Sequence, residues 1–244
     1  MRNAGLAGDY YLEFELRVLP RRGDERRIPG RLWGSKTTEG PITRLALTVQ
    51  EKSSGSPAKE TRLLVQGGPT PSAWSWPSVN GAAAAIAVDN AALFEPLAGT
   101  DLSAFDLQMP FLYWPDFVYE GKTRLYDRPA DTFLLYPPAS LAARRPELAA
   151  MRVYLDPQYH ALMQAEQLGD KERVLKSMRM VELKKIGDQW MVKAVELRDE
   201  TTRNKTRFVV TAAGLKRDFS PTLFEPGSLP SGFSAPSGLT SLRE

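Results

Sequence analysis

The chain has 244 residues, 42% hydrophobic and 25% charged, a composition typical of a folded protein with a sizeable core. Its net charge is only +3, and the densest basic cluster, residues 21–31, lacks interleaved aromatic side chains, so no nucleic-acid surface is predicted. The absence of cysteine excludes disulfides, thiolate zinc sites and cysteine nucleophiles, and no apolar run approaches the length that spans a membrane.

The N-terminal part of the chain is predicted to be β-structure. Residues 9–19 show the clearest alternation, with Leu12, Phe14 and Leu16 on one face and charged side chains on the other. A charged turn is expected at residues 20–29. Further strands are predicted between turn-rich segments at residues 30–36, 42–50, 60–66 and 84–88.

Residues 90–115 are dense in large apolar side chains and interrupted by proline. Asp101 or Ser103 is suited to cap a short helix, and Pro110 and Pro115 limit any helix to one or two turns. We therefore expect short helices and turns that lie over the sheet. Two more strands are predicted after this segment, at residues 116–124 and 131–136.

The region 150–213 predicts a long antiparallel meander. Gly-Asp pairs at 169–170 and 187–188 favour two-residue hairpins, because glycine supplies the positive φ that such turns need. Both faces of these strands carry apolar side chains, so something must cover the second face. The expected strands are residues 151–156, 160–168, 171–186, 189–199 and 205–213. One domain is expected over residues 1–229, followed by a disordered Ser/Gly/Pro-rich tail at 230–244.

The sequence offers few catalytic groups. His160 is the only histidine and is expected to lie exposed on a strand, and no nucleophile-elbow motif is present. With one histidine and no cysteine, a metal site is not expected. Asp101 and Asp106 are close enough in sequence to act as the acid/base pair of a hydrolase, but the favoured interpretation is that they cap or flank a short helix.

Aromatic and methionine side chains remain as candidates for a binding site. They either line an apolar cavity or form the core of a β protein; composition favours the core, and two apolar sheet faces favour the cavity. The candidate cavity and lid residues are Trp33, Trp74, Trp76, Phe105, Phe111, Tyr113, Trp114, Phe117, Tyr119, Met178 and Trp190.

Four stretches of the sequence resemble the outer-membrane lipoprotein-sorting, LolA-like, family. A strand at 181–186 leads through a lysine-rich hairpin into a strand that begins with Trp190. The next strand has the Lys-Thr start of residues 205–208, a Phe-x-Pro element follows at 223–226, and a Gly-Thr-Asp motif lies upstream at 99–101. The resemblance covers residues 90–229, and the first four strands follow by pattern alone.

This resemblance implies an incomplete, strongly curved antiparallel barrel whose open side is covered by short helices. It also implies a periplasmic carrier or chaperone, without enzymatic activity or cofactor, that binds the acyl chains of lipoproteins or lipids in an apolar cavity. Partners would be an inner-membrane donor and an outer-membrane acceptor, and the carrier would be a monomer. The periplasmic location presumes a signal peptide removed before Met1.

Two alternatives stay open: a β-rich interaction or sensor module without a lipid ligand, and a hydrolase that uses Asp101 and Asp106. On the carrier hypothesis, the segment 105–114 is expected to act as a lid that moves when cargo enters, because proline interrupts it and few backbone bonds are expected to hold it. Trp114 would then lie near the cavity mouth.

Overall fold

The computed structural model describes residues 6–50, 58–77 and 84–243, and most of them form one large antiparallel sheet. The sheet order is β6-β5-β4-β3-β2-β1-β13-β12-β11-β10-β9-β8-β7, and β14 adds to β13. β6 and β7 do not pair, so the sheet stays open. The strands are β1 (Asp9–Leu19), β2 (Arg26–Thr37), β3 (Gly40–Val49), β4 (Lys59–Gln66), β5 (Ser72–Pro77), β6 (Ile86–Ala87), β7 (Phe117–Leu125), β8 (Arg128–Leu135), β9 (Ala150–Leu155), β10 (Leu162–Leu168), β11 (Val174–Ile186), β12 (Gln189–Asp199), β13 (Lys205–Arg217) and β14 (Thr240–Ser241).

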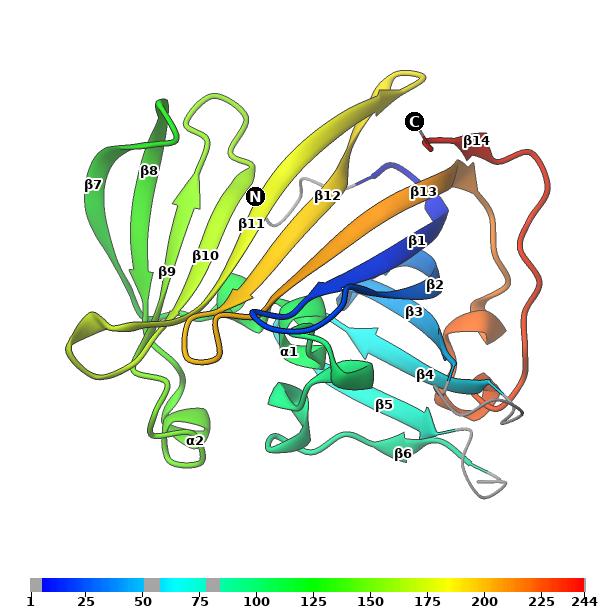
Figure 1. Ribbon diagram of the computed structural model, residues 1–244, viewed down its shortest axis with the longest axis horizontal. Helices are drawn as coiled ribbons and strands as arrows, with labels where there is room; N and C mark the ends of the chain where they lie inside the picture. The colour runs from blue at the N-terminus through cyan, green and yellow to red at the C-terminus, as the bar shows by residue number, and fades with distance from the viewer. Residues whose placement is uncertain (1–5, 51–57, 78–83, 244) are drawn as a thin grey trace.

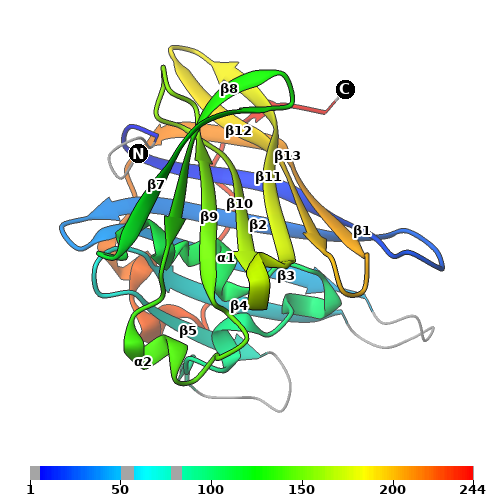
Figure 2. The ribbon, with the colours of Figure 1, turned by 90° about the vertical axis from the view of Figure 1, so that its left-hand side faces the viewer.

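Short helices lie inside the curve of the sheet, as Figures 1 and 2 show. They form a group between β6 and β7: η2 (Ala92–Phe94), η3 (Leu97–Gly99), α1 (Ala104–Gln108) and η4 (Pro110–Tyr113). We call residues 92–114 the plug. The remaining helical turns are α2 (Ala139–Ala142), η5 (Asp170–Glu172), η6 (Pro221–Phe224) and η7 (Pro226–Ser228). The prediction of a mainly β, incomplete and curved antiparallel barrel with short helices on its open side is confirmed.

The main core lies between the concave face of the sheet and the plug. The alternating apolar residues of β1, such as Phe14 and Leu16, point into it, as do Met178 of β11 and Leu197 of β12. From the plug, Phe105 contributes a side chain that is 1% exposed. Burial of these side chains supplies the main driving force for the curved arrangement.

The convex face of β1 to β4 is covered by the C-terminal segment, residues 218–239, which runs along the outside of the sheet (Figure 1). Tyr11 and Trp33 pack there against Leu223, and Leu64 packs against Leu229. Chain that follows the last long strand therefore covers the apolar convex face of β1 to β4.

Arg44 anchors this C-terminal segment and is only 1% exposed. Its guanidinium donates to the carbonyl oxygens of Leu223, Ser228, Leu229 and Ser231 and to the Ser228 hydroxyl, over distances of 2.7 to 3.2 Å. The backbone oxygens of an irregular segment are thus satisfied by one buried cation, which a segment without ladder bonds requires.

The expected disordered tail at 230–244 differs from the structure over residues 230–243. β14 pairs with Ala212 and Ala213 of β13. β12 pairs with β13 over residues 205–209, so the edge of β13 beyond Val209 is available to β14. Leu242 is 7% exposed and packs into the main core. Composition alone missed this because a two-residue strand and one apolar side chain leave almost no pattern.

Several local expectations are corrected. β2 begins at Arg26, not at residue 30; residues 26–29 pair with β1 alone, so Pro29 removes no bond to β3. β5 was not predicted as a strand. Gly187 turns the β11–β12 hairpin with a φ of +59°, as expected, but the pair at 169–170 leads into η5 instead of a two-residue turn. His160 lies in the β9–β10 turn with a φ of +51°, not on a strand.

Candidate functional site

The concave face of the sheet between β7 and β12 is the candidate site. Cross-strand register aligns one row of side chains on this face: Tyr119, Phe133, Val153, Ala165, Met178 and Leu197. The inner residues of the row are buried against the main core. The row becomes progressively more open toward the edge strand β7, because Phe133 is half-buried and Tyr119 is 50% exposed.

Aromatic rings concentrate at this open edge. Phe117 meets Phe133 edge-on with ring centroids 6.2 Å apart, and Tyr119 lies 5.1 Å from the same ring. Phe117 is 54% exposed. Leu155 and Leu162, paired across β9 and β10, extend the half-buried apolar surface. An edge strand with exposed rings on the concave side presents an apolar surface that the described part of the chain leaves uncovered.

The polar groups of the concave face lie mainly where the sheet meets the plug: Lys176 and Gln167 contact Asp106, and Thr206 contacts Asp101. The Tyr119 hydroxyl donates to Asp131 Oδ1 at 2.9 Å, and this bond raises the pKa of the tyrosine. Lys193 lies between Met191 and Val195 on β12 and takes the same face as they do, because alternate residues of a strand share a face. Its Nζ lies 3.0 Å from Glu182 Oε1. The half-buried surface formed by Phe133, Leu155 and Leu162 is therefore apolar.

The plug is fixed by buried polar bonds at its base. Ser103 caps α1, because its hydroxyl oxygen accepts from the Asp106 backbone N–H at 3.4 Å while its own backbone N–H donates to Asp106 Oδ2 at 2.8 Å. The Ser103 hydroxyl also donates to Asp106 Oδ2 at 2.6 Å. Asp106 also forms an ion pair with Lys176 of β11. Gln108 Nε2 donates to the carbonyl oxygens of Gln66 and Ser72, 3.1 Å from each.

Asp101 provides another link between the plug and the sheet. The Thr206 hydroxyl donates to Asp101 Oδ2 at 2.7 Å, while the Asp101 backbone N–H donates to the same hydroxyl oxygen at 2.8 Å. Burial raises the pKa of Asp101. Both carboxylates of the hydrolase hypothesis are thus engaged in holding the plug, as the capping interpretation predicts for Asp106.

The structure separates the aromatic residues that the sequence grouped together. Phe105, Phe111, Trp114 and Met178 lie in the main core on the concave side. Tyr113 is half-buried in η4, and Phe117 and Tyr119 lie at the open edge. Trp33, Trp74 and Trp76 pack on the convex face. Trp190 is 65% exposed and points outward, because its neighbour Met191 points into the core.

Sequence reasoning missed Phe133, Leu155 and Leu162 as site residues. Alternation alone gives two possible faces for each strand, and only the register of β7 to β11 shows which side chains share the concave one. The signal available in the sequence was the cluster of aromatic residues at 117–119 followed by Phe133.

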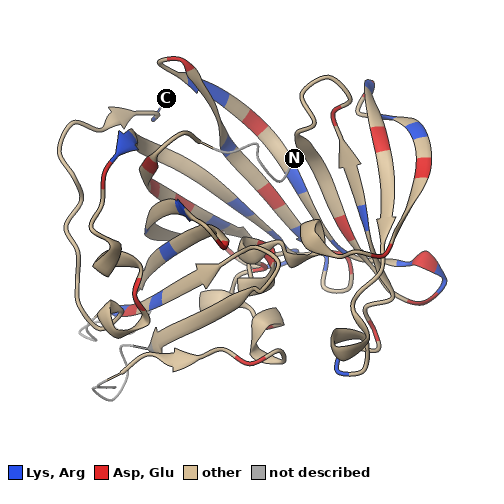
Figure 3. Ribbon diagram, turned by 180° about the vertical axis from the view of Figure 1, so that it is seen from behind, with Lys and Arg blue, Asp and Glu red and all other residues tan. Residues whose placement is uncertain are grey.

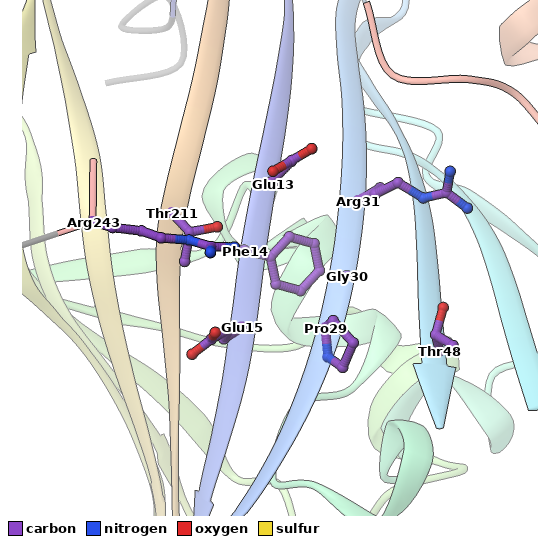
Figure 4. A pocket seen from close by; sticks show the side chains of 9 residues that line it. All are labelled: Glu13, Phe14, Glu15, Pro29, Gly30, Arg31, Thr48, Thr211 and Arg243. Atoms are coloured by element: carbon purple, nitrogen blue, oxygen red, sulfur yellow. The ribbon is translucent and has the colours of Figure 1, made fainter. Parts of the chain in front are cut away.

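A cavity of about 220 Å³ lies elsewhere, on the convex face (Figure 4). Its lining includes the carboxylates of Glu13 and Glu15 and the guanidinium groups of Arg31 and Arg243. Such a charged site does not suit an acyl chain, and its volume is below the 300 to 1,000 Å³ usual for ligand pockets. In the described part of the chain, no group of three metal-ligating side chains occurs, and no helix is long and apolar enough to cross a membrane.

An open, curved antiparallel sheet with an apolar concave face and a helical plug defines the protein as LolA-like in fold. Solved structures that share this fold include the following three. A domain from Vibrio parahaemolyticus assigned to outer membrane lipoprotein sorting superposes with a TM-score of 0.77 at 14% identity, over 93% of both chains. A DUF1329 family protein from Desulfovibrio piger gives 0.72 at 13% identity, over 91% of both chains. A LolA superfamily protein from Nitrosomonas europaea gives 0.63 at 12%, over 89% of this chain and 90% of that one.

The chain belongs to the family whose description reads "-like: Uncharacterized protein", since that family's model matches residues 84–231, more than half of the sequence. No curated protein matches the chain in sequence. The resemblance to LolA-like proteins that four short motifs indicated is confirmed.

Proposed function

We propose that this protein is a carrier, without enzymatic activity, that holds the acyl chains of lipidated proteins or lipids against the concave face of its sheet. The observation that carries the proposal is the uncovered apolar surface at the open edge, where Phe117 and Tyr119 flank Phe133. Exposed aromatic rings on the inside of a curved sheet are unfavourable in water unless a ligand covers them.

The chemistry of the face fits an acyl chain. Each buried methylene contributes about 0.8 kcal/mol, so covering ten of them offers about 8 kcal/mol before the cost of ordering the chain. Apolar burial is non-directional, so the site needs no hydrogen-bonding group where the acyl chain lies, and the half-buried surface formed by Phe133, Leu155 and Leu162 suffices.

The plug contributes the closed end of the site in this proposal. Its anchors, Asp101, Asp106 and Gln108, connect it to β13, β11 and β4, so moving it requires breaking buried polar bonds. We therefore place the entry of the acyl chain at the β7 edge. That the segment 105–114 moves on loading stays a prediction, and Trp114, at 5% exposure, is the residue whose fluorescence would report it.

A periplasmic location, and exchange of cargo with an inner-membrane donor and an outer-membrane acceptor, belong to the same proposal. They are supported by the fold shared with the lipoprotein-sorting domain of Vibrio parahaemolyticus and the LolA superfamily protein of Nitrosomonas europaea. The engagement of Asp101 and Asp106 in structural bonds supports a function without catalysis.

The test is direct. The protein is purified from a bacterial periplasm, extracted with organic solvent, and the extract is analysed by mass spectrometry; the delipidated protein is then titrated with a fluorescent fatty acid. We expect co-purified acyl lipid and saturable binding that unlabelled palmitate displaces. A clean extract together with no saturable binding would remove the carrier proposal and favour a β-rich interaction module.

A further inference from the structure

Three neighbouring hairpin tips on one rim of the sheet each carry an exposed aromatic side chain. In an antiparallel sheet, alternate turns lie on the same rim, so the β7–β8, β9–β10 and β11–β12 turns lie together, as Figure 1 shows. Tyr126 in the first turn is 59% exposed, Tyr159 in the second is 66% exposed, and Trp190 beside the third is 65% exposed. None of them belongs to the concave face described above.

Backbone strain marks the first of these aromatic residues. Tyr126 and Asp127 occupy the two central positions of their turn with φ of +51° and +62°. Glycine, asparagine and aspartate tolerate that conformation, whereas a bulky ring there is unfavourable. The ring is held by Arg179, whose guanidinium lies 4.1 Å from the ring centroid, and by a hydrogen bond from its hydroxyl to Gln164. A tyrosine kept at a strained tip and still mostly exposed points to an external contact.

The third tip is an extended apolar ribbon with lysines. Val181 and Leu183 are 36% and 49% exposed, and Trp190 lies across the hairpin from Lys185. Lys184 and Lys185 are both exposed at the same tip. Figure 3 shows basic and acidic positions along this hairpin, which projects beyond the body of the sheet. The acidic side chains, Glu182 and Asp188, pair with Lys193 and Lys216. The first tip adds Lys122 and Arg124, so cations accompany the aromatic residues at both ends of the rim.

We propose that this rim docks on the surface of a lipid bilayer that contains anionic headgroups. Tyrosine and tryptophan have an apolar body and a polar tip, which suits them to the boundary between headgroups and acyl chains. Lysine and arginine beside them are attracted to anionic headgroups and can extend their charged ends into water. Docking at this rim needs no bound cargo, so it can be tested independently of the carrier function.

The test is flotation with two kinds of liposome. One contains phosphatidylcholine alone, and in the other about one lipid in three is the anionic phosphatidylglycerol. The rim variant combines Tyr126→Asn, Tyr159→Ser and Trp190→Thr. Asparagine relieves the strain at position 126 and threonine suits a strand, so the variant is expected to fold. Ile86→Ser is the matched control, because Ile86 is 57% exposed on the distant strand β6.

We expect the wild type and Ile86→Ser to float with anionic liposomes and the rim variant to lose partitioning by at least about tenfold. Changing Lys184 and Lys185 to Gln should weaken binding roughly fivefold for each lysine, whereas Lys171→Gln on the opposite rim should have no effect. Brominated lipid should quench a fluorescence component that is missing in Trp190→Thr alone.

The proposal is overturned if the wild type binds neither kind of liposome, or if the rim variant floats as the wild type does. Either result would favour a protein partner for these aromatic residues. Equal quenching in the wild type and in Trp190→Thr would also overturn it. Titration of the rim variant with soluble fatty acid separates the two proposals, since acyl binding should be unchanged when only the rim is altered.

Discussion

Replacing Phe117 with serine tests the acyl face at its most exposed point. A phenylalanine side chain buries roughly 200 Å² when fully covered, and Phe117 is 54% exposed, which leaves roughly 100 Å² of ring in water. At about 25 cal/mol per Å², full coverage by cargo would contribute about 2.5 kcal/mol, an upper limit of about 70-fold in affinity. An acyl chain that covers one side of the ring would contribute about half of that energy, so we expect about an eightfold loss of affinity.

Val118→Ser is the matched control for this prediction. Val118 is the next residue on β7, is 49% exposed, and points to the opposite face, where it pairs with Leu134. Fluorescent fatty-acid titration of the delipidated protein measures both variants, with urea unfolding to show that each retains its stability. Equal affinity in Phe117→Ser and the wild type, or an equal loss in Val118→Ser, would refute the assignment of the concave face as the acyl site.

Three further predictions concern stability. Arg44→Met should lower the free energy of unfolding by about 3–5 kcal/mol, because it leaves buried carbonyl oxygens without a donor; urea denaturation should show no comparable loss for Arg27→Met, an exposed arginine paired with a neighbouring glutamate. Asp101 has a raised pKa, so the folded state binds the extra proton and stability falls as the pH rises from 3.8 through the raised pKa. Asp101→Asn should remove this decline while keeping an acceptor for Thr206, and a denaturation series across acid pH that retains the decline would contradict the assignment. Leu242→Ala should cost about 2–3 kcal/mol locally, measured as faster amide exchange at residue 242; unchanged exchange would mean that β14 does not depend on the buried leucine.

The strands near the N-terminus were predictable because their residues have a local period. The alternation of Leu12, Phe14 and Leu16 fixes both the strand and its inward face, and the structure gives β1 the predicted bounds. The cap of α1 was predictable for the same reason, since Ser103 and Asp106 are three residues apart and interact within one turn. Local chemistry of this kind needs no knowledge of the rest of the fold.

The grouping of the aromatic residues was not predictable from local chemistry. Trp33 and Phe105 looked equivalent as large apolar side chains, yet the first packs under the C-terminal segment and the second under the concave sheet. Which face a residue takes depends on strand register and on what covers that face, and both are set by contacts between residues far apart in sequence. The motifs that resemble the lipoprotein-sorting family indicated the fold, but not which aromatic residues lie on each face of the sheet.

By itself, then, the sequence determined the β-rich class, the capped plug and the resemblance to LolA-like proteins, because each follows from period, spacing or motif order along the chain. Only the tertiary structure decided which apolar side chains remain uncovered. Arg44 on β3 anchors a segment about 180 residues later in the chain, and this long-range contact hides one set of aromatic residues on the convex face. The unpaired edge of β7 leaves Phe117 exposed on the concave face. Exposure is a property of the whole packed chain, since each residue is covered by whatever the fold brings against it.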